Sequence, residues 1–277
     1  MLSRGLIGLV GSTHPVPSAA VTVLATVMSA VAGRSAGGCV LVAAAVLTGQ
    51  VSIGWCNDLV DRHRDRAAGR TDKPLATGAV PPRLVAVACG LAATACVPLS
   101  LASGWRAGVA HLAGVAGGWA YDLGVKRTVW SWLPYAGSFA LLTAFVTLGL
   151  PGHHPAPPAW LVVAGALLGT GAHFLNVVPD VEADLAAGVR GLPQRLGAAR
   201  AAVVGAVLLA AAVVVVTLGP GRPPWWAWAG LGVATGCAAG AGATGARREP
   251  GRAPFLLAVL TAAVAVALLV ARAPDLG

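Results

Sequence analysis

Long apolar runs recur along the chain, separated by short polar segments. Nine runs are found, at residues 16–34, 37–56, 82–102, 105–122, 130–150, 158–178, 199–219, 225–245 and 254–273. As a helix, each is long enough to cross a hydrocarbon core of about 30 Å. The sequence lacks alternating apolar and polar segments of about ten residues, which would indicate membrane strands. The pattern therefore predicts an all-α, polytopic membrane protein with nine transmembrane helices.

The composition agrees with this pattern. The 277 residues are 57% hydrophobic and 10% charged, with a mean hydropathy of +0.77. Alanine, glycine and valine dominate the apolar runs, and small side chains let helices approach closely. No low-complexity linker divides the chain, so residues 1–277 are expected to form one tightly packed domain. His153 and His154 fall in a short Pro-rich loop on the expected outer side.

The positive charges favour one side of the predicted membrane. With nine spans and the N-terminus inside, fifteen of the nineteen Lys and Arg residues fall in inner segments. This excess follows the positive-inside rule, so we expect an integral protein of the cell inner membrane, surrounded by membrane lipids. Topology also accounts for the formal net charge of +9, and nucleic acid is not an expected partner.

The acidic residues gather in two places on the inner side. Of the ten acidic residues, seven follow the second and sixth spans: Asp58, Asp61, Asp65 and Asp72, then Asp180, Glu182 and Asp184. The spacings of three and four residues in Asp58, Asp61 and Asp65 predict one helix face, and Asn57 joins that side. Asn176, Asp180 and Asp184 repeat every four residues, which predicts a second face with Glu182 out of phase.

Two such carboxylate faces need a counter-charge. Like charges at helical spacing destabilise a helix, and an Asp at mid-membrane costs about 2.5–3.5 kcal/mol on insertion scales. Hard oxygen ligands of this kind suit Mg²⁺, which we predict as the cofactor. Cations surround or follow both clusters: Arg62, Arg64, Arg66, Arg70, Lys73, Lys126, Arg127, Arg190 and Arg195. Carboxylates, Mg²⁺ and cationic side chains together are what a diphosphate needs.

A diphosphate site at the inner end of an apolar bundle also predicts the rest of the ligand. Its tail should be lipid-soluble, and an isoprenyl diphosphate meets both requirements. Stabilising the leaving diphosphate favours ionisation of the allylic C–O bond, and about 1.36 kcal/mol of such stabilisation gives a tenfold faster reaction. The sequence thus predicts an enzyme whose active site faces the cytoplasm.

Two motifs resemble those of the UbiA superfamily of intramembrane prenyltransferases. The family motifs NDxxDxxxD and DxxxD stand here as "NDLVDRHRD" (residues 57–65) and "DVEAD" (residues 180–184). The tract "GRTDKPLATGAV", with Lys73 where an arginine is frequent, and the segment "YDLGVKRT" are also similar. The DxExD form of the second motif resembles archaeal-lipid and uncharacterised bacterial branches at least as much as the 4-hydroxybenzoate branch. The resemblance covers nearly the whole chain.

This resemblance implies a nine-helix bundle around a central cavity, with two Mg²⁺ ions between the two motifs. The implied catalytic and metal-binding residues are Asp58, Asp61, Asp65, Asp180 and Asp184. The expected substrate-binding residues are Asn57, Arg70, Lys73, Tyr121, Lys126 and Asn176. The implied reaction transfers a prenyl group from an isoprenyl diphosphate to a small-molecule or lipid acceptor, aromatic or hydroxyl-bearing.

Other functions remain open at this point. A membrane terpene cyclase of the same superfamily would carry the same metal site without needing an acceptor. A transporter would place acids near the bilayer midplane, whereas these clusters lie at inner span ends. CDP-alcohol phosphotransferases carry paired Asp-Gly steps, which "NDLVDRHRDRAAG" lacks.

Several single residues have two interpretations. His173 either contacts the acceptor or packs between helices, and the packing role is favoured. His63 is expected in solvent, and Asp72 as a loop partner of the adjacent Lys73. The aromatic residues expected either to line a prenyl tunnel or to serve packing and interface roles are Trp55, Trp119, Phe139 and Phe174. Pro179 is expected to bend the sixth span.

Overall fold

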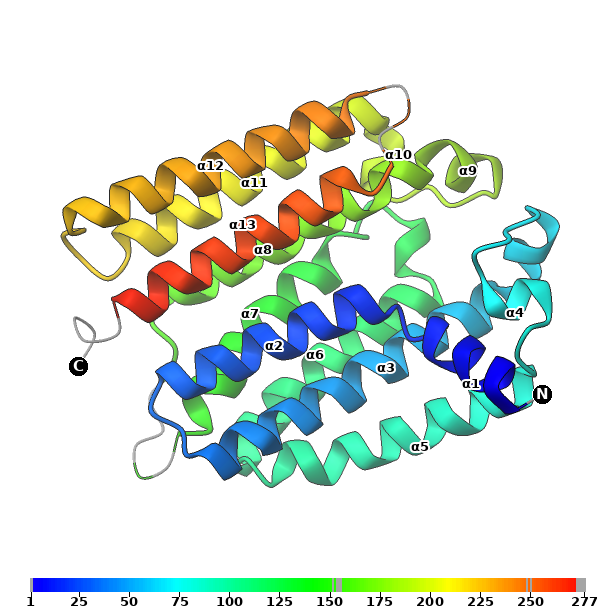
Figure 1. Cartoon of the computed structure of the whole chain (residues 1–277), viewed down its shortest axis with the longest axis horizontal. Helices are drawn as coiled ribbons and strands as arrows, with labels where there is room; N and C mark the ends of the chain where they lie inside the picture. The colour runs from blue at the N-terminus through cyan, green and yellow to red at the C-terminus, as the bar shows by residue number, and fades with distance from the viewer. Residues whose placement is uncertain (1, 151, 153–155, 248, 250, 273–277) are drawn as a thin grey trace.

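The computed structural model describes every residue except 1, 151, 153–155, 248, 250 and 273–277. Within this part of the chain every regular element is a helix (Figure 1). In chain order the elements are α1 (Leu2–Gly11), α2 (Pro15–Val31), α3 (Ala36–Ala67), α4 (Pro74–Thr77), α5 (Pro82–Leu101), α6 (Trp105–Leu123), η1 (Val125–Arg127), α7 (Leu133–Leu148), α8 (Ala159–Val177), η2 (Val178–Asp180), α9 (Val181–Ala186), α10 (Leu192–Leu196), α11 (Ala198–Leu218), α12 (Trp225–Gly245) and α13 (Ala253–Ala271). His153 and His154 lie outside the described residues.

A long helix matches each of the nine predicted apolar runs, namely α2, α3, α5, α6, α7, α8, α11, α12 and α13. Five helical stretches are both long and apolar enough to cross a membrane: α3, α5, the stretch Ala159–Ala186, α11 and α13. The pair α1 and α2, bent by 59°, provides a sixth if it counts as one span. The all-α membrane fold is therefore confirmed, whereas the number of nine spans stays a prediction.

Small residues set the close packing of these helices. A side-chain carbon placed on Gly171 of α8 would lie 2.9 Å from the carbonyl oxygen of Gly205 on α11. That separation is shorter than real carbon–oxygen contacts, so only glycine permits this approach. Phe174 and Leu175 of α8 pack in a buried cluster with Leu209 of α11. The tight bundle expected from the composition is thus present where these helices meet.

The segments that carry the acidic motifs lie at one end of the bundle. Helix α3 has 32 residues, and its charged last turns continue past the apolar part of its sequence. In Figure 1 the short helices α4, α9 and α10 and the N-terminal helix α1 lie at this same end, on the right of the view. We call this end of the bundle the polar end, because the charged turns of α3 lie there. Leu6, Ile7 and Val10 of α1 are exposed apolar side chains at the same end.

The second acidic motif does not sit on one continuous helix, contrary to the expectation from its four-residue spacing. Helix α8 ends at Val177, a single 3₁₀ turn follows, and α9 begins at Val181. Pro179 lies in that turn, and proline lacks the N–H that an α-helical hydrogen bond needs. The interruption expected at Pro179 is therefore present, within the single apolar stretch Ala159–Ala186.

Candidate active site

The first acidic motif forms one buried face of α3. Asp58, Asp61 and Asp65 are 1%, 3% and 5% exposed, although Asp is rarely buried without a partner. His63 lies off this face and is exposed, as expected. The shared helix face predicted from the spacing is therefore confirmed.

Cationic side chains from three segments neutralise this face. Lys126 follows α6 in η1, is 3% exposed, and donates from Nζ to Asp61 Oδ2 at 2.6 Å. Arg64 Nη2 donates to the same oxygen at 2.8 Å, and Arg64 Nε lies 3.7 Å from Asp65 Oδ1. Lys73 Nζ lies 2.8 Å from Asp58 Oδ1. Charge-assisted hydrogen bonds of this length are strong, so each of the two predicted lysines is fixed on one acid of this face.

Arg70 connects the two acidic motifs, although they are far apart in the sequence. Its Nη1 donates to Asp180 Oδ1 at 3.1 Å, and its Nε and Nη2 donate to the two oxygens of Asp72 at 2.8 and 2.9 Å. The hydrogen bonds from Arg70 lower the pKa of Asp72 to about 2, and the same bonds raise the pKa of Arg70. Asp72 thus pairs with Arg70 and not with the adjacent Lys73, which corrects the expected loop pairing.

The remaining acids of the second motif have different surroundings. Asp184 accepts a hydrogen bond on Oδ2 from Gln194 Nε2 at 2.9 Å. Glu182 is exposed, in agreement with its position out of phase with Asp184.

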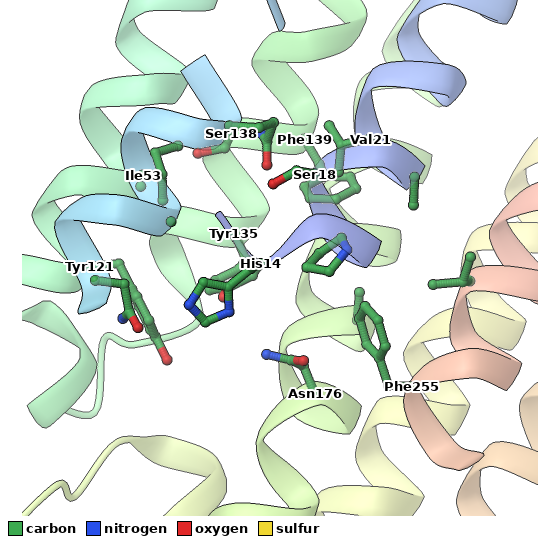
Figure 2. Close-up of a pocket in the computed structure, with 18 of the residues that line it drawn as sticks. His14, Ser18, Val21, Ile53, Tyr121, Tyr135, Ser138, Phe139, Asn176 and Phe255 are labelled. Atoms are coloured by element: carbon green, nitrogen blue, oxygen red, sulfur yellow. The ribbon is translucent and has the colours of Figure 1, made fainter. Parts of the chain in front are cut away.

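A cavity of about 990 Å³ joins these groups. Ten of the eleven predicted site residues line it, namely Asn57, Asp61, Asp65, Arg70, Lys73, Tyr121, Lys126, Asn176, Asp180 and Asp184. Asp58 is not part of that lining and lies behind Lys73 and His14. In Figure 2, His14, Tyr121 and Asn176 enter this space from three different helices or helix ends. The expected central cavity is present.

The cavity continues from its polar mouth into an apolar region. Helices α2 and α13 supply much of this part, with Val21 and Leu24 on α2 and Val259 and Val266 on α13. Phe139 of α7 also lines it. The other three aromatic residues proposed for a tunnel do not line it: Trp55 donates to the Leu9 carbonyl, Trp119 to Ser52, and Phe174 lies in a core cluster.

An aromatic cluster closes one wall near the mouth. Tyr135 stacks on His173 with ring centroids 4.5 Å apart, and Tyr121 meets both rings edge-on. His173 is fully buried, and its Nε2 lies 3.3 Å from Ser131 Oγ. The favoured packing role of His173 agrees with this placement.

Whether the acidic residues fit Mg²⁺ can be judged from their unused oxygens. Among the residues that the structure describes, no three His, Cys, Asp or Glu side chains are grouped closely enough to hold a metal ion. However, Asp58 Oδ2 and Asp61 Oδ1 are buried and have no hydrogen-bond partner in the described part of the chain. Buried carboxylate oxygens left unpaired are costly, and they are the hard ligands that Mg²⁺ prefers. The donor set therefore fits Mg²⁺.

Sequence reasoning missed three residues of this site. His14 is the N-cap of α2, and its Nε2 lies 3.0 Å from Asp58 Oδ1 and 3.2 Å from Lys73 Nζ. Arg64 was counted only among the surrounding cations. Asp122 accepts a hydrogen bond from Asn57 Nδ2 at 2.8 Å. Asp122 belongs to "YDLGVKRT", so a signal for it was present, whereas no spacing pattern links His14 to the acidic face.

The model of the UbiA prenyltransferase family matches residues 18–257. The bacteriochlorophyll synthase 33 kDa chain of Rhodobacter capsulatus is 32% identical over 203 residues, covering 65% of this chain and 63% of that protein. The protein of the same name from Cereibacter sphaeroides is 35% identical over 188 residues, covering 61% and 57%. The chain thus matches less than two thirds of the length of either relative.

Solved structures show the same fold. A UbiA homolog from Archaeoglobus fulgidus bound to GPP and Mg²⁺ has a TM-score of 0.69 at 19% identity, covering 95% of this chain and 99% of the other. A UbiA homolog from Aeropyrum pernix K1 has a TM-score of 0.72 at 19% identity, covering 92% and 97%. At these identities the likeness concerns the arrangement of helices.

Proposed function

Because the chain belongs to the UbiA prenyltransferase family, we propose that it transfers a prenyl group from an isoprenyl diphosphate to an acceptor within the membrane, in a reaction that depends on Mg²⁺. The observation that carries this proposal is the cavity itself. Its mouth combines both acidic motifs with Arg70, Lys73 and Lys126, and its interior continues between apolar helices. A ligand with a polyanionic head and an apolar tail matches both parts.

The acidic side chains provide the metal ligands in this proposal. Asp61, Asp65, Asp180 and Asp184 line the mouth, and the unpaired Oδ2 of Asp58, on the same face of α3, is a further ligand. Mg²⁺ held by these carboxylates would neutralise diphosphate oxygens and stabilise the leaving group. Mg²⁺ bound to a solved homolog from Archaeoglobus fulgidus supports this assignment.

The cationic side chains bind the diphosphate and stabilise it as it leaves. Arg70 presents a planar guanidinium at the mouth, where bidentate contact with phosphate is favourable. Lys73 and Lys126 are held by carboxylates of α3, so their ammonium groups are already positioned before substrate binds. Preorganised charge of this kind lowers the barrier to ionisation.

The aromatic wall protects the cation that ionisation leaves. Tyr121, Tyr135 and Phe139 line the cavity, and their ring faces attract positive charge. They also exclude water from the allylic carbon. Asn57 and Asn176 provide neutral hydrogen-bonding groups at the mouth without adding charge.

The acceptor is proposed to be aromatic or hydroxyl-bearing. Two relatives are named as synthases of bacteriochlorophyll, which favours a separate acceptor over internal cyclisation. The excess of Lys and Arg in the inner segments supports a cavity mouth on the cytoplasmic side of the inner membrane.

The deciding experiment supplies purified protein with labelled geranyl, farnesyl and geranylgeranyl diphosphates, with and without a panel of phenolic and lipid acceptors. We expect prenylated product that depends on acceptor and disappears when EDTA removes Mg²⁺, read by mass spectrometry. Terpene hydrocarbon or alcohol formed equally without acceptor would instead establish a cyclase. Intact diphosphates under every condition would refute both enzymatic functions and favour a transporter.

A further inference from the structure

Asp122 is a buried carboxylate that the proposed function has not yet used. It is the second-last residue of α6, is 2% exposed and lines the cavity. Asn57 Nδ2 holds its Oδ1 at 2.8 Å. Its Oδ2 is buried and has no hydrogen-bond partner among the described residues. One carboxylate oxygen is therefore fixed and the other is free.

The charge around Asp122 differs from that around the neighbouring acids. Asp61 is paired with Lys126 and Arg64, and Asp58 with Lys73. Within the described part of the chain, Asp122 has no Lys, Arg or His nitrogen within 4.0 Å. A buried carboxylate with one hydrogen-bond donor and no ion pair is unfavourable, and binding a proton removes that penalty. Asp122 is thus suited to accept a proton.

The position of Asp122 matches the place where a proton must be removed. Asn57 directly precedes Asp58, so the hydrogen bond fixes Asp122 beside the first acidic motif. Tyr121, its neighbour on α6, belongs to the aromatic wall. The carboxylate therefore lines the cavity beside the first acidic motif, to which the proposed function assigns the diphosphate, and its helix also carries part of the aromatic wall.

We propose that Asp122 is the general base that removes the proton from the acceptor, an inference that rests on the proposed function. The allylic C–O bond breaks and its electron pair leaves with the diphosphate. The acceptor's nucleophilic carbon or oxygen then forms a bond to the allylic carbon. The proton on that atom passes to Asp122 Oδ2, and its bonding pair returns to the aromatic ring or stays on oxygen. The neutral carboxylic acid later releases the proton to water.

A purely structural role makes a different prediction. If Asp122 only orients Asn57, an amide in its place suffices, because an Asn oxygen still accepts the Asn57 hydrogen bond. The test therefore compares Asp122→Asn with Asp122→Ala. Glu182→Gln is the matched control, since Glu182 is exposed and lies outside the cavity lining.

Two measurements separate ionisation from proton removal. Scrambling of bridge ¹⁸O in geranylgeranyl diphosphate reports C–O cleavage without acceptor, and product formation with the acceptor found in the panel above reports transfer. We expect Asp122→Asn to lower transfer by roughly 10²–10⁴-fold, the usual contribution of a general base, with scrambling within threefold of the natural protein. Formate added to Asp122→Ala should restore part of the transfer by replacing the lost carboxylate.

Other outcomes overturn the inference. Transfer by Asp122→Asn at the natural rate would assign Asp122 to orienting Asn57. Equal losses of scrambling and transfer would assign it to diphosphate binding. If the natural protein shows neither scrambling nor transfer, the proposed function itself fails, and that result is recognised before any variant is made.

Discussion

Lys126 and Asp61 form a buried ion pair that serves both folding and substrate binding. Both side chains are 3% exposed, and their charged atoms are 2.6 Å apart. Removing one partner of a buried pair leaves an uncompensated charge and typically destabilises a protein by about 3–5 kcal/mol. Removing both partners avoids that penalty. The double variant should therefore regain stability that the single variant loses, without regaining transfer activity.

We expect Lys126→Met to lower the melting temperature in detergent and to raise the KM for prenyl diphosphate. The double variant Lys126→Met with Asp61→Asn should recover most of the stability, because neither charge of the pair stays buried without the other and Arg64 still lies near Asp65. Its transfer activity should not recover, since the substrate-binding Lys126 and the proposed metal ligand Asp61 are both gone. Recovery of activity together with stability would show that the pair serves folding alone.

A substitution of Asp184 can test the metal site without disturbing the fold. Asp184→Asn keeps an oxygen that can accept the hydrogen bond from Gln194, so the fold should be retained. The lost charge should lower transfer by roughly 10²-fold or more, as loss of an electrostatic stabiliser does. Glu182→Gln in the same short helix is the control and should keep full activity. Comparable activity in both variants would remove Asp184 from the proposed metal ligands.

The junction between α1 and α2 positions His14 through an unusual backbone conformation and a close helix contact. His14 has φ 52°, the left-handed region, and is the non-glycine residue with positive φ in the described part of the chain. A side-chain carbon on Gly54 of α3 would lie 2.5 Å from the carbonyl oxygen of Thr13. The junction therefore rests directly on the backbone of α3, one turn before Asp58.

We expect Gly54→Ala to push this junction away from α3. Overpacking of this kind costs about 1–3 kcal/mol, and the shift should also weaken the contact of His14 with Asp58. Gly90→Ala on α5 is the matched control, because no described residue lies within 4 Å of a side-chain carbon there. The melting temperature and the transfer rate should both fall in Gly54→Ala and stay unchanged in Gly90→Ala. Equal behaviour of the two variants would show that the junction adapts freely.

Local patterns predicted the helices and the acidic face well, because both depend on residues near in sequence. The spacing of Asp58, Asp61 and Asp65 follows the helix period, and burial on one face results. For residues 176–184 the four-residue spacing also placed Asn176, Asp180 and Asp184 on one side, and all three line the cavity, although Pro179 interrupts the helix. The same reasoning missed His14, whose contact with Asp58 spans 44 residues. Such contacts depend on how helices pack, and no single segment encodes them.

The cavity as a whole is bounded by residues of several helices, and its apolar depth is set in part by small side chains of α13. Ala262, Ala263 and Ala267 line it together with Val259 and Val266. A larger side chain on this face would fill space that the prenyl tail needs. The chain length of the substrate should therefore depend on α13.

We expect Ala263→Phe to shift the preference toward shorter prenyl diphosphates, measured by competition between geranyl and geranylgeranyl diphosphate. Leu260→Phe is the control, since Leu260 of α13 is exposed and lies outside the cavity lining. An unchanged preference in Ala263→Phe would place the tail against a different wall.

The link that Arg70 makes between Asp72 and Asp180 has a consequence for the purified protein. The two halves of the chain meet at this guanidinium across 110 residues of sequence. Inorganic pyrophosphate with magnesium should bind at Arg70 and link both halves of the chain. At a hundredfold excess over its Kd, this binding should raise the free energy of unfolding by about 2.7 kcal/mol. A higher melting temperature with pyrophosphate, absent in Arg70→Met, is the expected result; no difference between the two proteins would contradict it. Samples kept with this tailless anion should then survive extraction from lipid longer than samples without it.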